Sequence, residues 1–283
     1  MASWIFVTIA CCLLSSLQAE TDYCTTTYCS VELENVGCNP PPATGGPACD
    51  GKSAEEVVLD SNLQSLILYE HNTRRSKFAL GQLESFLPAT RMPTITWDTK
   101  LAKQAGHNAR SCIDVHDSCR NTRVYRWAGQ NIILSKFGST MAPEDLVKNG
   151  INIWWSEYKD TTQDQLNSYP AGYEGPAIGH FTQMVSDQTD KLGCAIQHWL
   201  DGGSDAYYFV CNYAVTNALE HSIYKNGTVA SACTTGPNPI EELSGLCSPD
   251  ESINPVPNQY TVEQPCVECS STETDPFHVS LHG

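Results

Sequence analysis

The heptapeptide GHFTQMV, residues 179–185, decides how this chain is interpreted. It places a histidine, a threonine and a glutamine among apolar residues. The alternation of polar and apolar side chains predicts a β-strand over Phe181–Val185. A strand with this much hydrogen-bonding capacity leaves two alternatives. Either His180 takes part in function, or the polar side chains hold the local structure together.

The first residues are typical of a secretory signal peptide. The apolar run WIFVTIACCLLSSL covers residues 4–17, and the sequence that follows it predicts cleavage after Ala19. A membrane anchor needs roughly 20 apolar residues, and no later segment is long or apolar enough to cross a bilayer. We therefore expect residues 1–19 to be removed and the mature protein to be soluble and secreted.

Cysteine usage agrees with export. Of the 14 cysteines, Cys11 and Cys12 lie in the predicted signal, which leaves twelve. An even number in an exported chain predicts disulfides, although spacing alone does not assign the pairs. The single N-glycosylation sequon, at Asn226, is typical of a surface loop in the secretory pathway.

The formal net charge of −16 limits the classes of partner. It argues against nucleic acid, which needs clustered Lys and Arg, and against adsorption to anionic membranes. Residues 234–283 hold eight Asp or Glu and no Lys or Arg, so they account for 8 of the 16 net negative charges. With seven prolines as well, this tail is predicted to be a flexible acidic extension.

Three segments are predicted to be helices. Apolar residues recur at helical spacing over 54–80, and Ser53 followed by Glu56 forms a capping box. A second helix begins near residue 99 and runs towards His116. A third begins at Pro143, where proline and two acidic residues favour a helix start, and it ends in an aromatic stripe that we expect in the core.

Four segments are predicted to be strands, and Gly202-Gly203 joins the last two as a hairpin. The mixture of helices with mostly antiparallel strands predicts an α+β or sandwich arrangement. The strands are Gln130–Leu134, Phe181–Val185, Gly193–Trp199 and Tyr207–Tyr213.

Four polar residues are candidates for a functional site: His116 in CIDVHDSC, Gln130 in WAGQNI, Glu157 in WWSEY and His180 in the heptapeptide. Two neutral imidazoles can hold a divalent metal such as Zn²⁺, and a carboxylate beside them can orient a ring or act as a base. The same residues can also form a structural polar network. From the residues alone, the structural interpretation is favoured.

Several motifs in this order resemble the CAP superfamily of cysteine-rich secretory, antigen-five and pathogenesis-related proteins. HNTRR (71–75) and LAKQAGHNARSCIDVH (101–116) resemble its first two helices, and GHFTQMV and FVCNYAVTN (209–217) resemble its two signatures. The resemblance covers roughly residues 24–233. The N-terminal cysteine run and CNYAVTNALEHSIYKNG are most similar to the antigen-five branch from flies.

The resemblance implies a three-layer α-β-α sandwich with an open cleft and a tetrad of two histidines and two glutamates. His116, His180 and Glu157 match the tetrad, whereas Gln130 stands where the family has the glutamate of GEN. A neutral amide can hydrogen-bond but cannot act as a base at neutral pH. We therefore expect at most a weak zinc site at His116 and His180, and no catalytic residue.

The resemblance also implies four disulfides, of which the pair across the predicted hairpin is favoured by spacing as well. Sequence neighbourhood adds two pairs in the tail, the second of which, CVEC, has a redox or zinc motif as its alternative. The implied pairs are Cys24–Cys38, Cys29–Cys119, Cys49–Cys112 and Cys194–Cys211, followed by Cys233–Cys247 and Cys266–Cys269.

The sequence thus predicts a signal peptide (1–19), a cysteine-rich extension (20–52), a CAP domain (53–233) and an acidic tail (234–283). The predicted function is a secreted, non-enzymatic, allergen-like protein that binds an extracellular protein or a small lipid. One alternative is a metal-dependent hydrolase that uses His116, His180 and Glu157. The other is a structural or interaction module whose cleft is vestigial. Relatives occur in saliva, venom, haemolymph and reproductive fluid, and the sequence does not distinguish these.

Overall fold

The structure is a computed structural model that describes residues 21–251 and 253. The predicted signal peptide and most of the acidic tail lie outside these residues. Within the described residues a five-stranded sheet has the order β1-β4-β5-β3, with β2 paired parallel to β4 and the other pairs antiparallel. The strands are β1 (Glu55–Val57), β2 (Thr96–Trp97), β3 (Gly129–Phe137), β4 (Lys191–Asp201) and β5 (Ser204–Tyr213).

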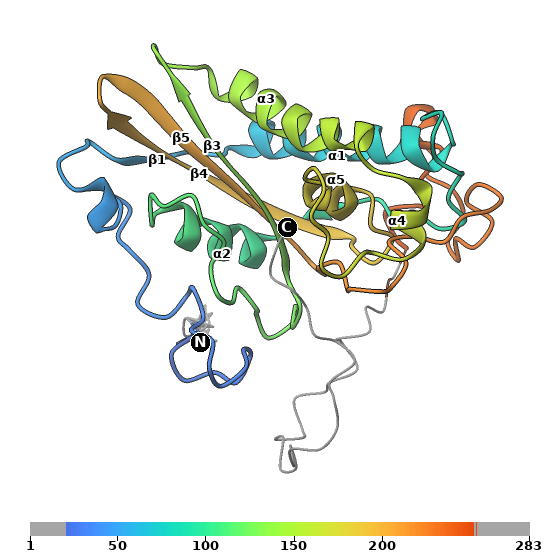
Figure 1. Cartoon of the computed structure of the whole chain (residues 1–283), viewed down its shortest axis with the longest axis horizontal. Helices are drawn as coiled ribbons and strands as arrows, with labels where there is room; N and C mark the ends of the chain where they lie inside the picture. The colour runs from blue at the N-terminus through green and yellow to red at the C-terminus, as the bar shows by residue number, and fades with distance from the viewer. Residues whose placement is uncertain (1–20, 252, 254–283) are drawn as a thin grey trace, which may run out of the picture.

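Helices cover both faces of the sheet, so the predicted α-β-α sandwich is confirmed. Helices α1, α3 and α5 lie on one face and α2 lies on the other (Figure 1). The hairpin predicted at Gly202-Gly203 joins β4 to β5, and both glycines have positive φ angles that other residues rarely adopt. The helices are α1 (Ser61–Ala79), α2 (Thr99–Ala109), α3 (Pro143–Ser156), α4 (Gln163–Asn167) and α5 (Gly179–Met184), with 3₁₀ turns at Pro47–Cys49, Glu157–Lys159 and Glu241–Leu243.

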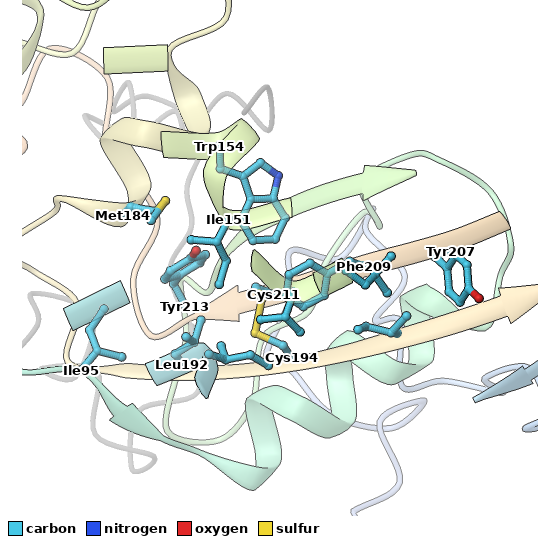
Figure 2. Packing of buried hydrophobic residues seen from close by; sticks show 14 residues of the cluster. Ile95, Ile151, Trp154, Met184, Leu192, Cys194, Tyr207, Phe209, Cys211 and Tyr213 are labelled. Carbon is cyan, nitrogen blue, oxygen red and sulfur yellow. A yellow bond between two sulfur atoms is a disulfide. The ribbon is translucent and has the colours of Figure 1, made fainter. Parts of the chain in front are cut away.

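The main core lies between the sheet and the helices α1 and α3. Trp154 of α3 is fully buried and stacks on Phe209 of β5 with ring centroids 5.0 Å apart. Figure 2 shows both rings above the disulfide that joins Cys194 of β4 to Cys211 of β5. Helix α3 comes this close because it carries Gly150, where a Cβ atom would lie 2.8 Å from the Phe209 ring.

A buried arginine fixes α1 to the heptapeptide. Arg75 is fully buried, and its guanidinium donates to the carbonyls of Met184 and Ser186 at 2.7 and 2.9 Å. It also donates to the carbonyls of Pro93 and Thr189. Because no carboxylate in the described part of the chain hydrogen-bonds to the guanidinium, these backbone dipoles compensate its charge. The end of α5 therefore depends on α1.

The heptapeptide corrects the strand prediction for Phe181–Val185, because residues 179–184 form helix α5. Phe181, Met184 and Val185 are spaced i, i+3 and i+4, which is one face of a helix, and all three are fully buried. The Thr182 hydroxyl donates to the Ile178 carbonyl at 2.8 Å, as threonine does within helices.

The predicted ends of two other helices are also wrong. Helix α1 begins at Ser61, where Asp60 caps the backbone N–H groups of the first turn; residues 55–57 belong to β1, and Ser53 is not a cap. Helix α2 ends at Ala109, because the chain turns at Cys112, whose φ angle is +57°. His116 therefore lies in a loop.

The first part of the predicted acidic tail is ordered. We expected residues 234–283 to be flexible, but residues 234–251 pack on the domain, with Leu246 and Cys247 fully buried. The Glu251 carboxylate is buried and accepts several hydrogen bonds from residues 234 and 235. These contacts, together with a disulfide, hold the segment against α1 and the loops beside it.

Five disulfides link the described residues, and their pairs match those expected from the resemblance and from neighbourhood. Three of them attach the N-terminal extension to itself and to the loop after α2. The sixth expected pair, Cys266–Cys269, lies outside the described residues. The five are Cys24–Cys38, Cys29–Cys119, Cys49–Cys112, Cys194–Cys211 and Cys233–Cys247.

Candidate functional site

The four predicted site residues form two pairs, which we call the His116 half and the His180 half. In the His116 half, Nδ1 of His116 lies 2.8 Å from Oε1 of Gln130, the second residue of β3. An amide oxygen only accepts, so the ring carries its hydrogen on Nδ1. The same Oε1 accepts a second bond from Asn108 of α2 at 3.2 Å.

The amide nitrogen of Gln130 is also fully engaged. Nε2 donates to Oδ2 of Asp117 at 2.7 Å and to Oδ1 of Asn212 at 2.9 Å. Because a carboxylate only accepts, Asp117 fixes which end of the amide is nitrogen. Gln130 is buried, and the four contacts use both donors and both acceptor positions of its amide. This half is therefore a saturated hydrogen-bond network.

Asp117 is itself fixed by an ion pair. Its Oδ1 accepts from Nε of Arg120 at 2.9 Å, and the two side chains are only 6% and 5% exposed. Arg120 also donates to the carbonyls of Asp117 and Ala128. Sequence reasoning missed Asp117 and Arg120, although their i, i+3 spacing in VHDSCR was a visible signal.

In the His180 half, an imidazole meets a carboxylate directly. Nδ1 of His180 lies 2.6 Å from Oε1 of Glu157, and Oε2 of Glu157 accepts the Phe181 backbone N–H at 3.0 Å. The Trp154 ring stacks beside the imidazole, with centroids 6.1 Å apart. Nε2 of His180 is buried and has no hydrogen-bond partner among the described residues. The Glu157 carboxylate therefore both orients the imidazole and accepts a backbone N–H in the first turn of α5.

Consecutive residues of β3 connect the two halves. Gln130 contacts His116, and Asn131 donates to the backbone carbonyl of His180 and to the Tyr213 hydroxyl, both at 3.1 Å. Successive side chains of a strand point to opposite faces of a sheet. The His116 ring and the His180 backbone carbonyl therefore contact side chains on opposite faces of the edge strand β3.

The chain of hydrogen bonds continues from Asn131 into the core. The Tyr213 hydroxyl lies 2.9 Å from Nε2 of His71, whose Nδ1 lies 2.8 Å from the Ile67 carbonyl. Burial lowers the pKa of His71 to about 3, so the ring is neutral at physiological pH. Neutral His71 donates to Ile67 and accepts from Tyr213, which fixes the tautomer.

The described residues hold no metal site with three or more ligands, and the weak two-histidine zinc site implied by the resemblance stays a prediction. Among residues 21–251 and 253, no group of three or more His, Cys, Asp and Glu side chains is arranged to hold a metal ion. The oxygen of Gln130 already accepts two hydrogen bonds, and Nδ1 of His180 faces Glu157. What the arrangement does chemically is to orient two rings in fixed tautomers.

Two further features lie on the surface, the predicted glycosylation sequon and a loop. Asn226 of the sequon is exposed, in a segment that forms an isolated bridge with Ala89. Residues 171–177, just before α5, are all exposed, and Tyr173 lies among them. These residues form an exposed loop just before helix α5, which carries His180.

The fold and the two pairs define a class of protein. Residues 68–213, more than half of the chain, match the cysteine-rich secretory protein family, CAP. The chain also superimposes on a solved structure of NaASP2 with Zn²⁺ with a TM-score of 0.54 at 25% identity, covering 74% of this chain and 100% of that one. The chain therefore belongs to the CAP family.

Within the family the chain is most like insect antigen-five proteins. It is 41% identical to Venom allergen-1 of Aedes aegypti over 254 residues, which are 89% of this chain and 97% of that protein. It is 34% identical to the Antigen 5 like allergen Cul n 1 of Culicoides nubeculosus over 204 residues, covering 69% and 90%. Such relatives and five disulfides are typical of an extracellular protein. In the described part of the chain, no helix combines the length and the apolar character needed to span a membrane.

Proposed function

We propose that this protein is a secreted CAP protein without enzymatic activity that binds an extracellular protein through a rigid surface turn. The venom-allergen names of its relatives favour venom or saliva over reproductive fluid as the secretion. The observation that carries the proposal is the turn Ser30–Glu34, in which all five residues are exposed. Val31 at its tip is 105% exposed, the largest value of any large apolar residue in the described chain.

Both ends of this turn are held in place. Cys29 is disulfide-bonded to Cys119, and the turn closes with a hydrogen bond from the Leu33 N–H to the Ser30 carbonyl at 2.9 Å. On the other side, the buried side chain of Asn35 donates to the Asn121 carbonyl at 2.8 Å. A segment that is already ordered loses little conformational entropy on binding, which favours affinity.

The chemistry of the turn defines the kind of partner. Val31 and Leu33 are exposed apolar side chains, and they alternate with Glu32 and Glu34. Apolar anchors bind in desolvated pockets, whereas charges at the rim steer association and select partners. We propose a protein partner with a small apolar pocket that is surrounded by Lys or Arg.

A pair of matched substitutions tests this proposal. Val31→Asp places a charge at the tip of the turn, whereas Val58→Asp makes the same change at another site that is 77% exposed. We expect wild type and Val58→Asp to cross-link to the same protein of the native secretion, and Val31→Asp to lose that product at least tenfold. Equal cross-linking by all three proteins, or none by wild type, would reject the proposal.

The lipid alternative has its own readout. Mass spectrometry of the native protein, followed by solvent extraction, detects a retained lipid directly. We expect no stoichiometric lipid. If wild type retains a lipid and Tyr173→Ser, a change in the exposed loop before α5, loses it, ligand binding would be assigned to that loop and not to the turn.

One observation favours a hydrolytic function as the second candidate. A ring that is oriented by a carboxylate and has an unpartnered Nε2 is the arrangement of a general base, and Glu157 and His180 provide it. Turnover on a peptide library, with and without Zn²⁺, that disappears in His180→Ala would support this candidate. We expect no turnover, because no Ser or Cys has been identified as a nucleophile beside this ring.

A further inference from the structure

Position 130 carries a glutamine where the CAP family has a glutamate, but an acidic residue, Asp117, follows directly after His116. Gln130 receives two N–H groups on Oε1 and donates to two oxygen atoms through Nε2. A glutamate in the same position would direct a second carboxylate oxygen at Oδ2 of Asp117 and Oδ1 of Asn212. Both of these atoms are acceptors in this structure, so the glutamate would have no donor on that side.

The side chain of Asp117 is held in place and cannot move away from a carboxylate at position 130. Its other oxygen is paired with Arg120, and the carboxylate is 6% exposed. Breaking a buried ion pair leaves an uncompensated charge, which is strongly destabilising. A carboxylate at 130 would therefore lie against a second carboxylate in a place that water does not screen.

We propose that positions 117 and 130 form a coupled pair in which only one member carries a carboxylate. In this chain the acid is Asp117, which is a positioning residue. It orients the amide of Gln130, and the amide in turn orients the ring of His116. On this proposal the amide of Gln130 is fully engaged and unavailable to a metal ion, and changing Gln130 alone is not expected to create a tighter metal site.

A double-mutant cycle tests the coupling. Gln130→Glu is expected to lower the melting temperature by about 5 °C, because it buries two facing carboxylates. Adding Asp117→Asn to Gln130→Glu exchanges the two groups: the amide introduced at position 117 donates to the new carboxylate and still accepts from Arg120. We expect the double variant to melt at least about 2 °C above Gln130→Glu, with recovery limited by the lost carboxylate partner of Arg120 and by the mismatched contact with Asn212.

Metal binding and ring tautomer supply readouts that a stability effect alone does not change. In calorimetry with Zn²⁺, Gln130→Glu is expected to bind no more tightly than wild type, and the double variant at least tenfold more tightly than Gln130→Glu. In ¹⁵N spectra, wild-type His116 is expected to hold its hydrogen on Nδ1, with an added Nε2–H form in Asp117→Ala.

Three outcomes would overturn the proposal. They are a Gln130→Glu variant as stable as wild type, a Gln130→Glu variant that gains Zn²⁺ affinity without a change at 117, and a double variant no more stable than Gln130→Glu. If Gln130→Glu alone does not fold, the folding of the double variant decides the question. Its recovery supports the coupling, and its failure rejects it.

Discussion

The His116 half and the His180 half present the same atom, Nδ1 of an imidazole, to two different partners. In one half the partner is the neutral amide of Gln130 at 2.8 Å; in the other it is the carboxylate of Glu157 at 2.6 Å. Asp117 orients the amide of Gln130 by accepting a hydrogen bond from it. Glu157 contacts its imidazole directly and also accepts the Phe181 N–H. A histidine and an acid can therefore remain associated even when the acid no longer touches the ring.

The two halves also differ in how many of their hydrogen-bonding atoms still lack a partner. In the His116 half, all hydrogen-bonding positions of the Gln130 amide are in use. The carboxylate of Asp117 is paired with Arg120. In the His180 half, Nε2 of the ring is buried and finds no hydrogen-bond partner within residues 21–251 and 253. Such a buried, unpartnered acceptor is where a water or a ligand atom gains most, since the group has already lost its solvent.

The largest expected effect comes from removing the support of one half only. Arg75→Met deletes the guanidinium that holds the carbonyls of Met184 and Ser186. Four buried carbonyl groups would then lack this donor, so we expect a loss of unfolding free energy of about 3–5 kcal/mol. Urea unfolding measures this loss.

A matched control for this change is Arg74→Met, on the same helix but half-buried. We expect it to cost about 1 kcal/mol or less. In NMR spectra of Arg75→Met, the signals of His180 should move and those of His116 should stay. Equal changes at both rings would show that the two halves are one unit.

An intermediate effect is expected from making the His180 half resemble the His116 half. In Glu157→Gln, one end of the side chain becomes a donor, but both ends face donors, on His180 and on the Phe181 backbone. We expect a loss of about 1–3 kcal/mol, because one buried N–H loses its acceptor. The control is Glu174→Gln in the exposed loop, which should change stability by less than about 0.5 kcal/mol. Equal stability of wild type and Glu157→Gln would show that His180 needs no carboxylate.

Much of the fold followed from the sequence, because motif order and regular periodicity are local properties. The start of α3 at Pro143 and the hairpin at Gly202-Gly203 were predicted correctly for this reason. Helix α5 was not, since six residues are too few to separate helical from strand spacing, and its burial comes from α1 and α3.

The site was harder to predict than the fold. The sequence identified His116, Gln130, Glu157 and His180, but not how they pair. Asp117 escaped because its role depends on where the loop after α2 meets β3, and the turn at Cys112 sets that meeting point. The i, i+3 spacing of Asp117 and Arg120 could indicate their ion pair, but not the contact of Asp117 with Gln130, which depends on this backbone turn.

The smallest expected effect is the loss of stability that the buried His71 causes when the pH is lowered. His71 is connected to the His180 half through Tyr213 and Asn131. Burial lowers the pKa of His71 to about 3 in the folded protein, against about 6.5 in an unfolded chain. Below pH 6.5 the unfolded chain binds a proton that the folded protein does not, so stability falls as pH falls towards 3. Between pH 7 and pH 6 we expect His71 to account for a loss of roughly 0.7 kcal/mol.

Urea unfolding of wild type and His71→Gln at both pH values isolates this contribution, because the remaining histidines are common to the two proteins. The acid-induced loss should be smaller in the variant by about that amount. Glu251 does not interfere: burial alone raises its pKa, but hydrogen bonds from Thr235 and Thr234 outweigh burial and lower it to about 2. Its contribution is therefore lost only as pH falls below about 4.5. An unchanged pH dependence in the variant would mean that His71 does not link the core to α5 through protonation.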